Sequence, residues 1–299
     1  MNQAKGFLAL LVSGIFYASY VILARWIALS FGNISQTVVR SGVALLILGT
    51  WFAYKKLKPV LPRKVSKFKL FIYLITPPLS ISSFTQSVMR IKASNVYFFI
   101  YAGIFISTFF LGLFLFKEKV SRLKIVSLLL ACLGIYLLSY PLQISSLTGA
   151  VFAMLAGFFD SLQMSMCKYL GSYRRIFLLF YEYLVGTIVG LFLVFVFKEQ
   201  MLVGFAPISI LAAILIGFFQ IGIGYLYLYG FNNFDINLGS IVASSELFFA
   251  MLWSAIFLRE FPGRLEVLGG FLVFLAVNII SFSLLNIKKL KFKYLGVKQ

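Results

Sequence analysis

Residues 111–124 read LGLFLFKEKVSRLK, and residues 253–266 read WSAIFLREFPGRLE. Each stretch is a charged hairpin between two apolar segments, and at an offset of 142 positions Glu118 aligns with Glu260. The first hairpin has four basic residues and one acid, whereas the second has two basic residues and two acids. Because positively charged loops stay on the cytoplasmic side of a membrane, this difference predicts two copies of one unit with opposite orientation.

The composition is typical of an integral membrane protein. Hydrophobic residues make up 62% of the 299 positions and charged residues 12%, and the mean hydropathy is +1.00. A soluble domain of this length cannot bury so much apolar surface. The net charge of +19 does not indicate nucleic-acid binding, because the Lys and Arg residues gather in short loops and in the C-terminal tail. We expect them to contact the anionic headgroups of a lipid bilayer.

The residues that most enzyme and metal sites need are scarce. Histidine is absent, and both cysteines, Cys132 and Cys167, fall inside apolar segments. We therefore expect no enzymatic activity, no metal site, no cofactor and no disulfide framework. The first apolar run, residues 7–24, has no small-residue cleavage site, which predicts a retained first helix rather than a signal peptide.

Ten apolar runs of about 20 residues predict ten transmembrane helices. They cover residues 7–27, 34–54, 70–89, 94–116, 123–140, 149–169, 176–197, 206–229, 237–258 and 264–286. If the N-terminus lies inside, 20 of the 27 Lys and Arg residues fall on the cytoplasmic side. This bias predicts a multi-pass protein of the cytoplasmic membrane with both termini in the cytoplasm.

The ten helices divide into two predicted repeats, residues 1–145 and residues 146–299, the second with a basic tail. Five helices per repeat is an odd number, so two repeats of one fold must insert with opposite polarity. An ungapped alignment of residues 92–139 with 234–281 gives few identities. The expected fold is thus an all-α integral membrane protein of ten transmembrane helices arranged as two inverted five-helix repeats.

In several motifs the chain resembles the EamA-type members of the drug/metabolite transporter superfamily. The motifs are the two hairpins, TVVRSGVALLIL around Arg40, and SSELFFAMLWSAIFLRE in helix 9. The resemblance covers essentially the whole chain and implies a central cavity between helices 1, 3, 4, 6, 8 and 9 that opens alternately to each side. Family members often have a Glu-Pro pair in helix 9, but here Glu246 precedes Leu247, so we expect no proline kink there.

Helices 3 and 8 are predicted to bend beside the substrate. Helix 3 contains Pro77-Pro78 followed by SISSFTQ, and helix 8 is rich in glycine. Proline removes a helical N–H and glycine weakens a helix, so both helices can bend or expose carbonyl groups. The alternative is that these residues serve only close helix packing. The side chains expected near the ligand are Ser83, Gln86, Gln220 and Tyr225.

Acidic residues within spans are costly and are candidate functional residues. Glu246 lies near the midplane of helix 9, and Asp160 lies midway along helix 6 with Gln163 three residues further on. We expect these side chains to bind the substrate, although structural ion pairs with Arg40, Arg25 or Lys168 are the alternative. Glu182 lies closer to the cytoplasmic end of helix 7, where it can face headgroups.

Two tyrosines and the two hairpin acids complete the set of candidate residues. Tyr17 on helix 1 and Tyr101 on helix 4 can reach the cavity and are weaker candidates for substrate binding. Glu118 and Glu260 are expected to be structural and to bond a hairpin or a neighbouring helix start, where negative charge is favourable.

The leading functional hypothesis is a secondary transporter that exports a small metabolite, such as an amino acid, or a drug-like solute. The first alternative is a carrier of a bulkier solute, such as a nucleotide sugar or a lipid-linked headgroup, which needs basic residues facing the cavity. The second alternative is a non-transporting membrane scaffold or receptor. The expected partners are a small-molecule solute and the lipid bilayer, with no nucleic acid. The oligomeric state is left open, and a monomer is compatible with the sequence.

Overall fold

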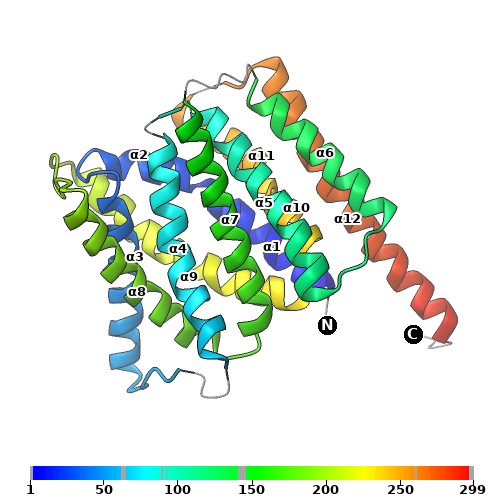
Figure 1. The fold of residues 1–299 in the computed structure, drawn as a ribbon, viewed down its shortest axis with the longest axis horizontal. Helices are drawn as coiled ribbons and strands as arrows, with labels where there is room; N and C mark the ends of the chain where they lie inside the picture. Colours follow the sequence, from blue (N-terminus) through cyan, green and yellow to red (C-terminus); the bar gives the residue numbers. More distant parts are fainter. Residues whose placement is uncertain are drawn as a thin grey trace.

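The computed structural model is a bundle of long helices (Figure 1). It describes residues 3–61, 65–88, 90–91, 93–140, 146–259 and 261–295. The helices are α1 (Gln3–Ala18), α2 (Tyr20–Ala28), α3 (Ser35–Tyr54), α4 (Lys67–Val88), α5 (Ala93–Phe116), α6 (Arg122–Leu138), α7 (Leu147–Leu170), α8 (Arg175–Val196), α9 (Pro207–Asn233), α10 (Ile236–Ala243), α11 (Ser245–Trp253), the π-helix η1 (Ser254–Leu258) and α12 (Arg264–Leu295).

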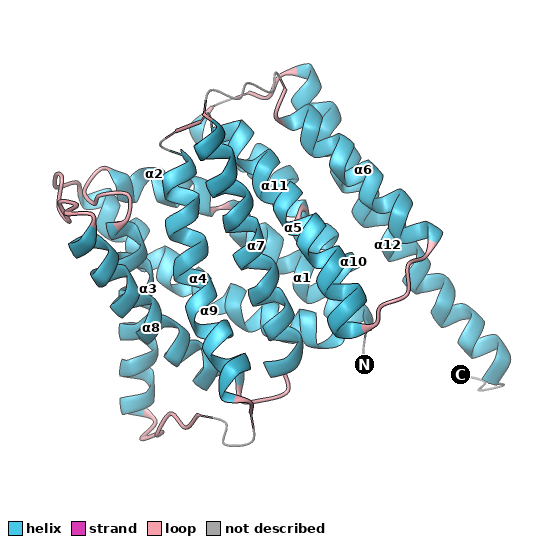
Figure 2. Ribbon diagram, in the orientation of Figure 1, coloured by secondary structure: helices cyan, strands magenta, loops and turns pink. Residues whose placement is uncertain are grey.

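These helices correspond to the ten predicted spans, so the fold prediction is confirmed. α1 and α2 together form the first span, and α10, α11 and η1 together form the ninth. In the described part of the chain, seven spans are long and apolar enough to cross a membrane by length and composition alone. α4, α6 and α12 complete the ten. Loops gather at the two ends of the bundle (Figure 2).

Four residues in the left-handed backbone region mark equivalent turns in the two repeats. Lys56 and Lys198 follow α3 and α8 with φ of 51° and 50°, and Lys117 and Arg259 follow α5 and η1 with φ of 51° and 56°. Both pairs are separated by 142 positions, which is the offset of the two hairpins. A left-handed residue commonly ends a helix, and a basic side chain there complements the negative helix end. Corresponding helices of the two repeats therefore end in the same way.

The packing also repeats. α3 contacts α8 and α6 contacts α12, while the contact of α5 with α7 is matched by that of α1 with α10 and α11. A glycine lies where α7 crosses α5, and another lies where α1 crosses the ninth span. A Cβ on Gly157 of α7 would lie 2.1 Å from the Ile100 carbonyl oxygen, and a Cβ on Gly14 of α1 would lie 2.8 Å from Ser245 Oγ. Glycine lets the two backbones approach closely at each crossing.

Two spans are interrupted, and neither is a span that the proline and glycine pattern indicated. The first span breaks at Ser19 and the ninth at Ser244, without a proline at either place. Their hydroxyls donate to the Phe16 and Ile241 carbonyls at 2.6 and 2.7 Å, and such bonds compete with the helical pattern. By contrast, α4 and α9, which are the third and eighth spans, are each one continuous helix with Pro77 and Pro78 inside α4, and the expected bend of these two spans stays a prediction.

Candidate functional site

A cavity of about 390 Å³ lies between the two repeats. Helices of both repeats line it. They include α3 and α8, which are the second and seventh spans and which the family resemblance had not implied. Its polar lining includes seven tyrosines, Tyr17, Tyr20, Tyr73, Tyr97, Tyr101, Tyr183 and Tyr227. The other polar lining side chains are Arg25, Asn33, Gln36, Arg40, Ser80, Thr85, Asp160, Gln163, Glu182, Gln220 and Glu246.

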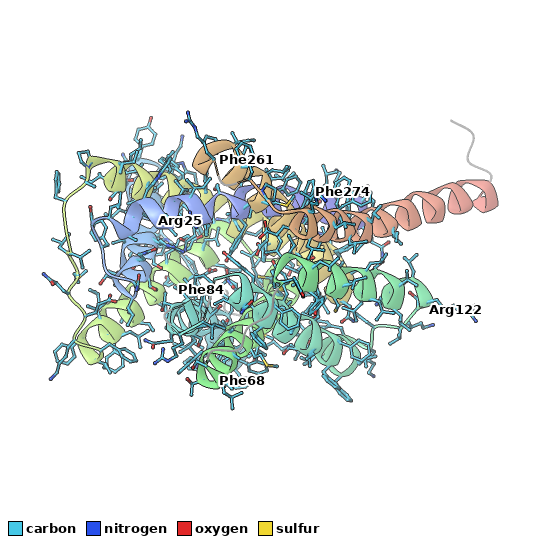
Figure 3. The ribbon with its side chains drawn as sticks, turned by 90° about the horizontal axis from the view of Figure 1, so that it is seen from above. Arg25, Phe68, Phe84, Arg122, Phe261 and Phe274 are labelled. Carbon is cyan, nitrogen blue, oxygen red and sulfur yellow. The ribbon has the colours of Figure 1, made fainter. Side chains whose placement is uncertain are left out.

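The cavity reaches the surface at one end of the bundle. The lining residues Arg25, Ala28 and Asn33 are exposed and lie where α2 meets α3. Figure 3 views the molecule from above and labels Arg25, which lies at this end. The opposite end is closed by the lining residues Tyr73 and Cys167, each only 1% exposed. In the described part of the chain, the exposed lining residues thus lie at one end of the cavity only.

Three of the eight acidic residues in the chain line this cavity. Glu246 accepts a hydrogen bond from the Tyr101 hydroxyl. Glu182 accepts one from the Tyr73 hydroxyl and another from Gln163 Nε2 at 3.2 Å. Uncharged donors thus hold Glu246 and Glu182, and neither acid forms an ion pair within the described residues.

The break in the ninth span positions Glu246. α10 ends at Ala243 and α11 begins at Ser245, so Glu246 lies in the first turn of α11. The first turn of a helix has amide groups without helical partners and a partial positive charge, which stabilise a carboxylate. The interruption at Ser244 therefore brings the N-terminal end of a helix, with its acid, to the cavity wall.

Arg40 brings a positive charge to the cavity wall from α3. Its Nη2 donates to Gln36 Oε1 at 2.8 Å, and its guanidinium lies 5.7 Å from the centre of the Tyr20 ring. Its Nε is buried and has no hydrogen-bond partner among the described residues. Gln220 Oε1 is likewise buried and without a partner in the described part of the chain. Among the described residues, one buried donor and one buried acceptor of lining side chains are thus without a partner.

Six of the nine side chains that the sequence nominated for substrate binding line the cavity. They are Tyr17, Tyr101, Asp160, Gln163, Gln220 and Glu246.

The other three nominated side chains lie outside it. Ser83 is buried elsewhere on α4, Gln86 Oε1 accepts from Arg90 Nη1 at 2.5 Å, and the Tyr225 hydroxyl accepts from Arg175 Nη1 at 3.3 Å. The continuous α4 explains the first two, because only one face of a helix can point inward.

Sequence reasoning missed the contributions of α3 and α8. Glu182 was expected to face headgroups, but it is 7% exposed and lines the cavity, so that expectation was wrong. Arg40 was considered as part of a motif and as an ion-pair partner, but it was not nominated for substrate binding. The signal that points to both is rarity: a charged residue inside a span faces the bundle interior or a water-filled cavity in almost every case.

Comparison with protein families identifies the chain. The model of the EamA-like transporter family matches residues 4–140 and, a second time, residues 147–282. The chain belongs to the EamA-like transporter family. The two matches coincide with the two five-helix halves of this EamA-like transporter, and they confirm the resemblance inferred from the hairpin motifs.

The fold of the EamA-like transporter is also similar to that of a solved protein described only as "Crystal structure of protein". The two chains are 10% identical, the TM-score is 0.79, and the similarity covers 94% of this chain and 98% of the other. At that identity the similarity concerns the fold alone. No curated protein matches the chain.

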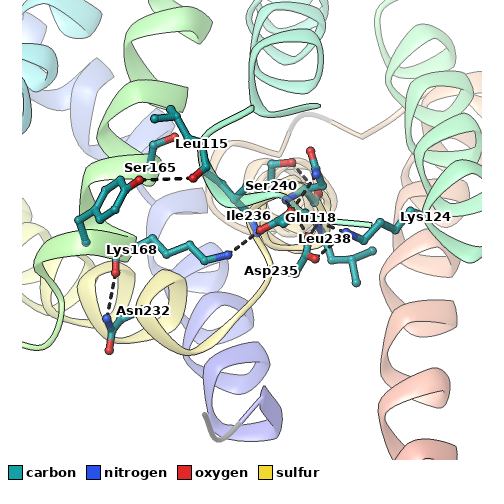
Figure 4. A network of polar contacts seen from close by, with 12 residues as sticks. Leu115, Glu118, Lys124, Ser165, Lys168, Asn232, Asp235, Ile236, Leu238 and Ser240 are labelled. Atoms are coloured by element: carbon teal, nitrogen blue, oxygen red, sulfur yellow. Dashed lines mark hydrogen bonds and ion pairs between the residues drawn. The ribbon is translucent and has the colours of Figure 1, made fainter. Parts of the chain in front are cut away.

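At the closed end of this EamA-like transporter, one carboxylate joins four helices (Figure 4). Glu118, just after α5, accepts from Lys168 Nζ of α7 at 2.6 Å and from the Ile236 amide of α10 at 2.7 Å. Lys124 of α6 lies 3.6 Å from Glu118 and donates to Asp235 at 2.5 Å. The expected structural role of Glu118 at a helix start is confirmed, whereas Glu260 lies outside the described residues.

The two acids of this network differ in pKa. Burial opposes the charged form of Glu118, but its hydrogen bonds with Asp235, Lys168 and the Ile236 amide outweigh burial and lower its pKa to about 2. Burial and the neighbouring Glu118 raise the pKa of Asp235 to about 6. Glu118 therefore stays charged at mildly acidic pH, whereas Asp235 takes up a proton near pH 6.

Proposed function

We propose that the protein is a secondary transporter that moves a small metabolite or drug-like solute across the membrane by alternating access. The observation that supports this best is a polar cavity between two repeats that is open at one end and closed at the other. Inverted-repeat transporters bind substrate in this way between their repeats, and rocking of one repeat against the other changes the open side.

The proposed substrate site is the cavity itself. The proposed contacts include the six cavity-lining side chains nominated from the sequence, which are Tyr17, Tyr101, Asp160, Gln163, Gln220 and Glu246. Arg40 and Glu182 are added because they also line the cavity. A volume of about 390 Å³ lies at the lower end of the range of small-molecule sites, which favours a small solute over a nucleotide sugar.

The proposed orientation places both termini in the cytoplasm and the chain in the cytoplasmic membrane. The basic loops carry this proposal, because Lys and Arg concentrate at one end of the bundle. The open end of the cavity then faces away from the cytoplasm, which fits the release step of an exporter.

Counterflow in liposomes tests the proposal. Purified protein is reconstituted into liposomes, which are loaded with one solute at a time from a panel of amino acids, amines, nucleosides and sugars. Uptake of the same solute in labelled form is then measured. We expect saturable counterflow of at least one solute, which Glu246→Gln slows or makes independent of pH. The matched control Glu266→Gln lies outside the cavity, at the start of α12, and should leave the rate unchanged. The absence of saturable flux across the panel would favour a scaffold or receptor.

A further inference from the structure

Arg40 is the feature of the cavity that the proposed function leaves unexplained. Within the described part of the chain it forms no ion pair, and its only direct hydrogen bond goes to the neutral Gln36. Its Nε donor is buried and unused. A cation inside a span is costly unless it has an anionic partner. Because three acids line the same cavity and none of them reaches Arg40, the missing anion is expected to arrive with the ligand.

We propose that Arg40 and Gln36 form a subsite for the carboxylate of a zwitterionic solute, whose ammonium group points toward Asp160 and Glu246. This inference rests on the proposed function and adds the charge pattern of the substrate. A guanidinium binds a carboxylate through two parallel hydrogen bonds, and its two terminal nitrogens offer that geometry. A phosphate dianion fits less well, because three carboxylates in the cavity would repel its second charge.

The tyrosines lie between the two charged ends. Tyr97 and Tyr17 are each within electrostatic reach of both Arg40 and Glu246, and Tyr17 is also within reach of Asp160. Ring faces accommodate an apolar middle and also attract an ammonium group. The unused acceptor Gln220 Oε1 provides a further partner for a donor. The cavity thus combines a positive end, an aromatic belt and a negative end, which is the complement of a zwitterion.

A series of ω-amino acids measures this arrangement, because the spacing of their two charges increases by one methylene at a time. The probes are glycine, β-alanine, γ-aminobutyrate and their longer ω-amino homologues, each compared with the n-alkylamine and the alkanoate of the same length. Binding to the full-length protein in nanodiscs is measured by titration calorimetry and by thermal shift. We expect one length to bind best and both single-charge analogues to bind at least about tenfold more weakly.

Substitution of Arg40 assigns the carboxylate to its subsite. Arg40→Gln should weaken binding of the best ω-amino acid by at least about tenfold and change binding of the alkylamine by less than about twofold. The retained alkylamine binding also shows that the variant is folded. Arg40→Lys keeps the charge but loses the planar fork, so we expect an intermediate loss. The matched control Arg175→Gln removes an arginine outside the cavity and should leave both affinities unchanged.

Three outcomes would overturn the inference. The first is an alkylamine that binds as tightly as the ω-amino acid of the same length. The second is an Arg40→Gln variant with unchanged affinity for the ω-amino acid, and the third is a folded wild type that binds none of the probes. Saturable counterflow of another solute in liposomes would, in each of these cases, leave the transporter proposal standing. Loss of counterflow for every solute would contradict the transporter proposal itself.

Discussion

Two of the three cavity carboxylates, Glu246 and Glu182, each accept a hydrogen bond from a tyrosine, and this arrangement has a measurable energetic consequence. Tyr101→Phe removes the hydroxyl that donates to Glu246 and leaves a buried acceptor unpaired. We expect the free energy of unfolding to fall by about 1–3 kcal/mol, the usual cost of an unsatisfied buried group. Thermal unfolding in detergent measures it. Tyr54→Phe is the control, because Tyr54 is 80% exposed. Equal melting temperatures for the two variants would contradict this account.

The pair of Asp235 and Glu118 predicts a particular pH dependence. Asp235 has a pKa of about 6 in the fold and 3.8 as its ordinary value, so the folded state binds its proton more tightly. Stability therefore falls as pH rises from about 3.8 to about 6 and is flat above that window. Asp235→Asn cannot titrate and keeps an oxygen for the helix start.

The measurement is the melting temperature of wild type minus that of Asp235→Asn. We expect this difference to decrease between pH 4 and pH 6 and to stay constant between pH 7 and pH 8. A difference that increases with pH over the lower range would show that the charged form of Asp235 is the favoured one.

Sequence alone reached some site residues because of their chemistry. Glu246 and Asp160 stand out because an acid in an apolar span has few explanations other than function. Ser83 and Gln86 were misplaced because hydroxyl and amide side chains are common in spans and the inward face of α4 depends on its packing. Arg40 was visible in the sequence, but the absence of a carboxylate beside it is a property of the folded cavity only.

At the scale of helices, the close crossing of α5 and α7 at Gly157 predicts that alanine is destabilising there but not at an open glycine position. A Cβ on Gly157 would lie 2.1 Å from the Ile100 carbonyl oxygen, so Gly157→Ala must push the two helices apart. We expect it to lose about 1–3 kcal/mol of unfolding free energy. Gly49→Ala on α3 meets nothing within 4 Å and should be neutral or more stable, because alanine favours a helix.

Thermal unfolding of both alanine variants under one set of conditions makes the comparison. The result that contradicts close packing is a Gly157→Ala variant that melts at or above the temperature of Gly49→Ala. Such a result would mean that α5 and α7 do not approach each other as the structure has them.

The ten spans could be predicted because apolar length is a strong signal, whereas helix interruptions could not. Pro77 and Pro78 lie in a continuous α4, but the breaks occur at Ser19 and Ser244, which resemble many other serines in apolar segments. A serine hydroxyl can bond a helical carbonyl without breaking the helix, as Ser161 does with the Gly157 carbonyl in α7. Tertiary contacts therefore decide which hydroxyl coincides with a break, and those contacts are not present in the local sequence.

At the scale of the whole molecule, the Glu118 network lies where the cavity is closed and joins the two repeats. Glu118 and Lys124 belong to the first repeat, while Lys168, Asp235 and the start of α10 belong to the second. Under the proposed alternating access, opening of this end requires the repeats to separate, so these bonds have to break. Hydrogen bonds to charged groups contribute about 1.5–3 kcal/mol each, which is enough to change the balance between two access states.

The native Cys167 reports on that balance, because it lines the closed end and is 1% exposed. In a Cys132→Ser background it is the single thiol of the chain. Glu118→Gln removes the charge that holds the repeats together, so we expect a membrane-impermeant thiol reagent applied from the closed side to label Cys167 at least about threefold faster. Lys119→Gln alters an exposed neighbour and should not change the rate. Equal labelling of both variants would mean that Glu118 stabilises the fold without controlling access.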